Sequence, residues 1–171
     1  MNTMPPSLGF QTSSAGVIPP GPTKEQGREL LNLKAIDWPS VFERLADVWD
    51  ALSTKVVAQW PWIQSRRERN WVEGIAYIAD YCDFEVPTDH AIDPLSAFVS
   101  FTPTAEGDTL EAHSGMCGES SGTRWFRGPT VLVSNTTEDV ARVAVELAEE
   151  LAQHTDIIIE GLQQPTYPPE S

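Results

Sequence analysis

The chain has 171 residues, of which 40% are hydrophobic and 21% charged, and its formal net charge at pH 7 is −14. This length fits a single domain, and the apolar content is too high for a wholly disordered chain. The apolar runs are too short to cross a bilayer, and the excess of carboxylates disfavours direct binding to nucleic acid or to an anionic membrane.

The two ends of the chain differ in composition from its middle. Residues 1–23 are rich in Pro, Ser, Gly and Thr, and residues 162–171 contain three Pro. Such segments cannot bury a core, so we predict flexible Pro-rich tails at 1–23 and 162–171 around one domain at 24–161. The start lacks the basic residues of a secretory signal, and Cys82 and Cys117 are too few for a disulfide framework. We therefore expect a cytoplasmic protein with free thiols.

Helical periodicity dominates the first half of the domain. A first helix is predicted over 23–33. The clearest helix spans 38–53, because Asp37 can cap it, Pro39 suits its first turn, and apolar residues recur at three- and four-residue spacing. A third helix is predicted over 65–83 from the same kind of spacing.

The period changes beyond Pro94. Alternating β-branched and aromatic residues predict strands at 95–103, 108–114 and 129–134, with 123–126 as a further pairing partner. A strongly amphipathic helix capped by Asn135 is predicted over 136–153, and 156–160 is predicted to be a last short strand. The order predicts an α+β fold, in which amphipathic helices cover a small antiparallel sheet of three to four strands.

One motif suggests catalysis. Residues 118–122, GESSG, match the G-x-S-x-G pattern of the nucleophile elbow in serine hydrolases. An elbow needs a strand before the serine and a helix directly after it, whereas Gly122, Gly128 and Pro129 oppose a helix here. We therefore interpret the stretch as a loop, and a small hydrolase that uses Ser120 or Cys117 stays the third hypothesis.

No cofactor or metal site is predicted. Zinc sites favour tight pairs of ligands, and the residues that could form one are Cys82, His90, His113 and Cys117. Only His113 and Cys117 are closely spaced, and a second tight pair is missing. The sequence also lacks a Gly-rich phosphate loop and a dinucleotide fingerprint.

The charge pattern carries the leading hypothesis. Residues 70–123 contain ten acidic residues and no Lys or Arg, directly after a cluster of three arginines at 66–69. Such a field steers basic partners, although solubility alone can explain it. Trp60 and Trp62 flank Pro61 beside the arginines; they suit either an interface anchor or a locally packed corner. The predicted partner-binding residues are Asp83, Glu85, Asp89, Asp93, Trp60 and Trp62.

Three functional hypotheses follow. The first is a non-enzymatic acidic binding protein, of the immunity or inhibitor type found in bacteria or phages, that masks a basic site on a protein partner such as a toxin. The second is a structural or assembly protein, chaperone-like or part of a particle, that uses its Pro-rich arm. The third is the small hydrolase.

Overall fold

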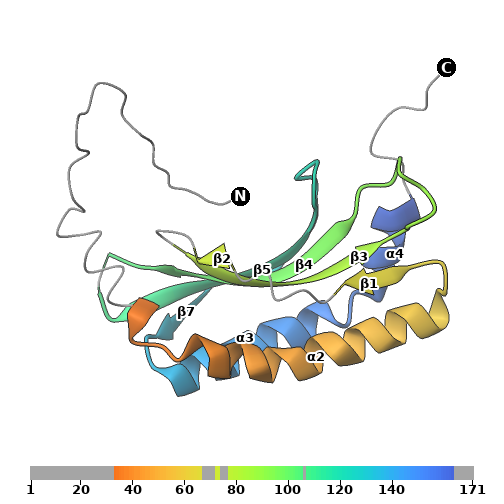
Figure 1. Cartoon of the computed structure of the whole chain (residues 1–171). Helices are drawn as coiled ribbons and strands as arrows, with labels where there is room; N and C mark the ends of the chain where they lie inside the picture. The colour runs from red at the N-terminus through yellow and green to blue at the C-terminus, as the bar shows by residue number, and fades with distance from the viewer. Residues whose placement is uncertain (1–32, 67–71, 74–76, 106, 164–171) are drawn as a thin grey trace, which may run out of the picture.

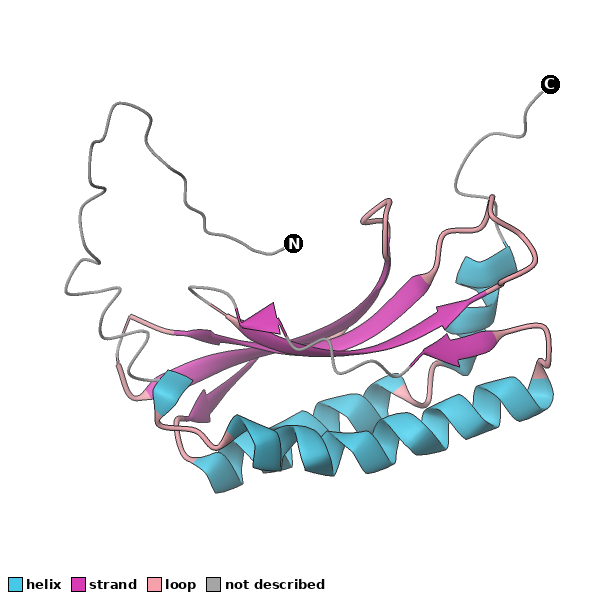
Figure 2. Ribbon diagram, viewed as in Figure 1, coloured by secondary structure: helices cyan, strands magenta, loops and turns pink. Residues whose placement is uncertain are grey.

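The computed structural model describes residues 33–66, 72–73, 77–105 and 107–163. In this part of the chain three helices and seven strands form an α+β fold, and the strands make one antiparallel sheet. Figure 1 shows helices α2 and α3 side by side beneath one face of the sheet, and Figure 2 shows the opposite face without a described helix over it. The predicted tail at 1–23 lies outside the described residues.

The elements follow the chain as helix, sheet, helix. Their bounds are α2 Trp38–Gln59, β1 Gln64–Arg66, β2 Val72–Glu73, β3 Ile78–Glu85, β4 Leu95–Pro103, β5 Thr109–Gly118, β6 Arg124–Arg127, β7 Val131–Ser134, α3 Thr137–Leu151 and α4 Thr155–Gln163. The α+β class with an antiparallel sheet is confirmed, whereas the predicted strand count of three to four is too low.

Helix α2 confirms the prediction for 38–53 and continues six residues beyond it. Asp37 is the N-cap, and its side chain accepts a hydrogen bond from the backbone N–H of Ser40 at 3.3 Å. The apolar stripe along the helix is buried against the sheet and α3. The helix ends where the backbone N–H of Trp60 donates to the carbonyl of Val56, directly before Pro61.

Helix α3 begins beside the start of α2. The N-cap is Thr136, whose hydroxyl accepts from the backbone N–H of Asp139, so the predicted cap at Asn135 is one residue too early. The backbone N–H of Asp37 donates to the Thr137 hydroxyl at 3.0 Å, and Arg44 pairs with Glu138 at 3.2 Å. The two helices therefore start at the same end of the molecule and pack side by side.

The sheet is built from long hairpins. Strand β3 pairs with β4, and β4 pairs with β5, in continuous antiparallel registers. The strand predicted over 95–103 matches β4, while the strand predicted over 108–114 continues to Gly118. β5 is long enough to pair with β7 at its start and with β6 at its end, and its register with β6 shifts between Met116 and Cys117.

Two predicted elements are wrong. Residues 78–83, which the helical spacing predicts as the end of a helix over 65–83, lie in strand β3, and β1 and β2 take up further residues of that segment. Ile, Tyr, Cys and Phe within 78–84 favour a strand once both neighbouring strands are in place, and this pairing overrides the helical spacing.

Residues 156–160, predicted to be a strand, lie in helix α4, because Ile158, Ile159 and Leu162 are buried at helical spacing. The helix also takes two residues from the predicted tail at 162–171.

Alternation along the strands creates two faces. We call the face toward the helices the covered face; on β4 it carries Leu95, Ala97, Val99 and Phe101, which are all buried. We call the other the open face. Its residues on the three central strands are Ala79, Tyr81, Asp83, Glu85, Ser96, Phe98, Ser100, Thr102, Thr109, Glu111, His113, Gly115 and Cys117.

One buried carboxylate interrupts the covered face. Asp80 is 4% exposed, and its Oδ2 accepts a hydrogen bond from Nε1 of Trp49 on α2 at 3.1 Å. A buried charge is tolerated only when polar partners replace its water, and the indole N–H of Trp49 is one such partner. This bond ties the middle of α2 to strand β3.

Candidate functional site

Two of the four predicted partner-binding carboxylates are buried. Asp93 is 6% exposed and Asp83 is 7% exposed, so neither contributes an exposed charge. Asp89 is exposed, and its Oδ1 accepts from the backbone N–H of Ala91 at 3.0 Å. The fold uses the carboxylates of Asp83 and Asp93 in internal contacts, and the role of the four residues in binding a partner stays a prediction.

Asp93 holds the loop between β5 and β6. Its two oxygens accept hydrogen bonds from the backbone N–H groups of Ser120 and Ser121, at 2.9 Å for the shortest bond to each. Burial opposes ionisation, but these bonds outweigh it and lower the pKa of Asp93 below its usual value of 3.8. A side chain on Gly118 would collide with the Asp93 carboxylate and the Ser121 hydroxyl, so the loop requires glycine there.

Ser120 therefore lies in a hairpin loop. Residues 119–121 form a turn between β5 and β6, and strand β6 follows at Arg124 rather than a helix. The interpretation of GESSG as a loop is confirmed, because the strand-then-helix context of a nucleophile elbow is absent at this position. The backbone N–H of Ser120 is also directed to the Asp93 carboxylate.

Glu85 belongs to an ion-pair cluster around Arg66. The guanidinium lies 2.8 Å from Glu119, 3.7 Å from Glu85 and 4.0 Å from Asp83. Burial lowers the pKa of Arg66, but the three neighbouring carboxylates outweigh this and raise it. This cluster links β1, β3 and the β5–β6 loop at one end of the sheet. Three of the ten carboxylates predicted to form the acidic surface of 70–123 thus share one of the protein's own arginines.

The two tryptophans differ in exposure. Trp60 is partly buried and packs against the core, while Trp62 is 40% exposed. The two tryptophans lie in a short turn, in which the Ile63 N–H donates to the Trp60 carbonyl at 3.0 Å. Trp60 therefore fits the interpretation as a locally packed corner, and the role of Trp62 as an interface anchor stays a prediction.

The possible metal ligands lie on different sides of the sheet. Cys82 is buried on the covered face, where its Sγ lies 3.4 Å from the Ser53 hydroxyl, while Cys117 is on the open face. His90 is exposed in the β3–β4 connection. Within the described ranges no three of the His, Cys, Asp and Glu side chains are arranged to hold a metal ion. Burial raises the pKa of the Cys117 thiol, which disfavours the reactive thiolate.

A hydroxyl–imidazole–carboxylate chain lies on the open face and was not predicted. His113 Nε2 is 2.9 Å from Glu111, and Nδ1 is 3.3 Å from the Thr130 hydroxyl. The same groups serve in nucleophilic catalysis. Here the His113 and Glu111 side chains are 34% and 42% exposed, so the water-excluded environment that strengthens such catalysis is missing. These three interacting side chains are best explained as a cross-link between β5 and the segment before β7.

An aromatic row crosses the open face. Tyr81 on β3 lies 6.3 Å from Phe98 on β4, and the Arg124 guanidinium from β6 lies 5.4 Å above the Phe98 ring. Gly115 makes room for this arrangement, because a side chain there would press on the Phe98 ring and the Phe126 carbonyl. We call Tyr81, Phe98 and Arg124 the aromatic row. Burial raises the pKa of Tyr81 to about 12, so its phenol stays protonated and can donate a hydrogen bond.

Most of the exposed carboxylates in the described part of the chain lie on the three helices. The three helices carry ten acidic residues against the cations Arg44, Lys55 and Arg142. All of these carboxylates except the half-buried Asp139 are exposed. We call this side of the molecule the helical layer; its acidic residues are Glu43, Asp47, Asp50, Glu138, Asp139, Glu146, Glu149, Glu150, Asp156 and Glu160.

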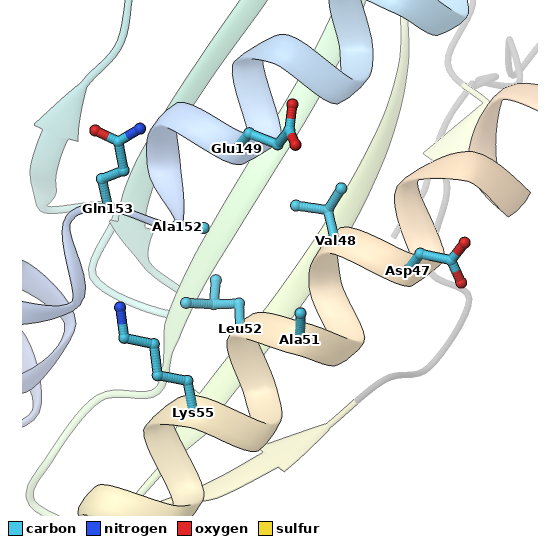
Figure 3. A pocket seen from close by; sticks show the side chains of 8 residues that line it. All are labelled: Asp47, Val48, Ala51, Leu52, Lys55, Glu149, Ala152 and Gln153. Atoms are coloured by element: carbon cyan, nitrogen blue, oxygen red, sulfur yellow. The ribbon is translucent and has the colours of Figure 1, made fainter.

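A groove runs between α2 and α3 on the helical layer. Its volume is about 530 Å³, and we call it the α2–α3 groove. Figure 3 shows Asp47 and Lys55 toward opposite ends of the lining part of α2, with Glu149 on α3 across from them. The lining residues are Asp47, Val48, Ala51, Leu52, Lys55, Glu149, Ala152 and Gln153. The groove therefore combines an apolar floor with carboxylates at its rim.

No protein-family model, curated protein or solved structure matches this chain. Among the helices that the structure describes, none combines the length and the apolar character needed to cross a bilayer. Function must therefore be argued from the two surfaces themselves: the α2–α3 groove and the open face.

Proposed function

We propose that this chain is a non-catalytic protein-binding domain that docks a basic polypeptide on its helical layer. The observation that carries the proposal is the α2–α3 groove, which is lined by the apolar residues Val48, Ala51 and Leu52 and by the carboxylates of Asp47 and Glu149. The net charge of −14 supports it, because such a charge raises the encounter rate with cationic partners.

The mechanism has two stages. Long-range attraction by the helical layer first brings a cationic surface close, and salt weakens this stage. Apolar side chains of the partner then enter the groove and displace its water, which supplies most of the lasting affinity. A basic amphipathic helix fits both requirements, since one face carries apolar anchors and the other carries Lys or Arg.

Lys55 makes the charge at one end of the groove differ from that at the other end. It lies eight residues after Asp47 on the same helix, which is about 12 Å along the axis. A bound helix would place its cations near Asp47 and Glu149 and a carboxylate near Lys55. Covering a basic site on a partner in this way is the action of an immunity or inhibitor-type protein.

The test uses a synthetic amphipathic helix with Leu anchors on one face and Lys on the other, titrated by isothermal calorimetry. Ala51 is exposed on α2 and lines the groove, so Ala51→Trp should block it without changing the charge. We expect Kd to rise about 10-fold, corresponding to about 1.4 kcal/mol. Ala58→Trp is the matched control, because Ala58 is exposed on the same helix about 10 Å further along.

Two double variants with the same change in net charge separate docking in the groove from general electrostatic attraction. Asp47→Lys with Glu149→Lys changes the groove, whereas Asp156→Lys with Glu160→Lys makes the same change in net charge on α4. The groove pair should weaken binding about 10-fold more than the α4 pair. If the two pairs weaken binding equally and Ala51→Trp has no effect, the groove is not the docking site and the proposal fails.

A further inference from the structure

The open face carries a second, oppositely charged feature. Arg124 and Arg127 lie on β6 at the end of the strand order, and both are exposed. Neither arginine forms an ion pair within the described part of the chain, unlike Arg66 on β1. In a molecule with a net charge of −14, these two cations form a local positive site around Phe98, since Arg124 lies over its ring and Arg127 lies across the neighbouring Gly115.

Arg124 is positioned to bind while it stacks. A guanidinium over an aromatic ring uses its flat face for the contact, so the N–H groups at its edge remain free to donate. The ring contact with Phe98 also restricts the long side chain, which reduces the entropy lost when a carboxylate binds. An exposed, pre-positioned guanidinium of this kind favours bidentate binding of a carboxylate.

We propose that the open face binds an extended acidic segment of a second protein, which presents an aromatic side chain to Tyr81 and Phe98 and a carboxylate to Arg124. This inference does not rest on the helical-layer function, because it uses the opposite face of the sheet and a partner of opposite charge. No described helix covers this face (Figure 2).

The geometry sets the spacing of the segment. The Arg124 guanidinium lies 5.4 Å from the Phe98 ring centre, and Tyr81 lies 6.3 Å from it on the other side. In an extended chain, residues two apart point to the same side and are separated by about 6.6 Å. The recognised pattern is therefore an aromatic residue and an Asp or Glu separated by one residue. Arg127, which faces Gly115 across the β5–β6 pairing, is placed for a further carboxylate.

Charge decides between a polypeptide and a nucleic acid. Aromatic and Arg side chains on an open antiparallel sheet can also stack single-stranded bases. Glu111 lies on the open face and Asp108 is exposed in the β4–β5 loop, while Glu85 and Glu119 share the single charge of Arg66 with Asp83. These carboxylates would repel a continuous phosphate backbone, whereas a short peptide needs to place only one or two carboxylates beside the arginines.

The experiment titrates the full chain with the capped peptide Gly-Ser-Phe-Thr-Glu-Ser-Gly and follows backbone amide shifts by NMR. We expect the amides of Phe98, Gly115 and Arg124 to move, and those lining the α2–α3 groove to stay unchanged. Peptides with Phe replaced by Ser, or Glu by Lys, should bind about 10-fold more weakly. A peptide with Phe and Glu adjacent should lose a similar factor, because the two groups then point to opposite sides.

Protein variants assign the contacts. Arg124→Gln should weaken the Phe-Thr-Glu peptide about 10-fold and leave the peptide lacking Glu unaffected, while Arg142→Gln on α3 is the control of equal charge change. Phe98→Leu keeps an apolar side chain and should remove the preference for Phe. The proposal is overturned if no open-face amide shifts at about 1 mM peptide. It is also overturned if an oligouridine binds the same residues more tightly than the peptide does.

Discussion

The two faces of the sheet show how one set of strands can serve two purposes. On β4, Phe101 is fully buried against α2, where its ring lies 5.4 Å from Trp38, while Phe98 on the other side is only half-buried. On the central strands the covered face is apolar except for Asp80 and Ser114, and the open face mixes aromatic, cationic and acidic side chains. The covered face supplies stability, and the open face is left available for binding.

The largest effect is expected from Phe101→Ala. The side chain has no exposed surface, so its removal loses burial and leaves a cavity between the sheet and α2. We expect the free energy of unfolding to fall by about 3–5 kcal/mol, measured by urea denaturation. A loss below about 1 kcal/mol would mean that the covered face is not the main core.

Asp93→Ala tests whether the predicted partner-binding acid is structural. The change leaves the backbone N–H groups of Ser120 and Ser121 without their acceptor, which should cost about 2–3 kcal/mol of unfolding free energy. Because the folded-state pKa is lowered, the stabilisation is complete above about pH 4 and is lost as the pH falls through that pKa. The difference between wild type and variant should therefore shrink in acid. Asp89→Ala in the same β3–β4 connection is the control; it removes one exposed hydrogen bond, from the Ala91 N–H, and should change stability by about 1 kcal/mol at most.

Trp49→Phe tests the one buried carboxylate of the covered face. The variant removes the indole N–H that donates to Asp80, and we expect a loss of about 2 kcal/mol, since bonds to charged groups are the stronger ones. Trp38→Phe is a close control, because its indole donates to the neutral carbonyl of Leu33. Chemical denaturation should show a loss of about 1 kcal/mol in the free energy of unfolding for Trp38→Phe. Equal losses would indicate that the charge on Asp80 does not matter.

Phe98→Ala is expected to have the smallest effect on stability. A half-buried ring loses about 1 kcal/mol of burial, together with its contact to Arg124. The comparison with Phe101→Ala on the same strand is direct, since the two substitutions are identical and differ only in the face. Binding of the Phe-Thr-Glu peptide should nevertheless be strongly reduced. A stability loss as large as that of Phe101→Ala would show that the open face is part of the core.

The sequence alone was sufficient for elements with a strong and unambiguous period. Helix α2 has a capping Asp37, Pro39 in its first turn and a regular apolar stripe, and strand β4 alternates clearly. The segment 78–85 could not be assigned in the same way, because its apolar residues fit a helical spacing as well as a strand that is buried on both sides. Residues 156–160 were ambiguous for a similar reason, being a short apolar run.

The candidate sites were harder to predict than the elements. A run of carboxylates in the sequence says nothing about which face each one joins, so the sequence predicts surface charges at Asp83 and Asp93, which the fold buries. The acidic residues of α3 were visible as one polar side of an amphipathic helix, and that signal could have located the helical layer. The aromatic row had no such signal, because its three members lie on three different strands.

The sequence by itself determined the class of the fold, the position of α2, β4 and α3, and the overall negative charge, because these depend on local periodicity, capping and composition. Tertiary structure alone decided where the charge acts. Strand pairing placed Arg66 among three carboxylates, buried Asp93 beneath a loop, and brought Arg124 over Phe98. These contacts join residues far apart in the chain, and only the packed sheet makes them neighbours.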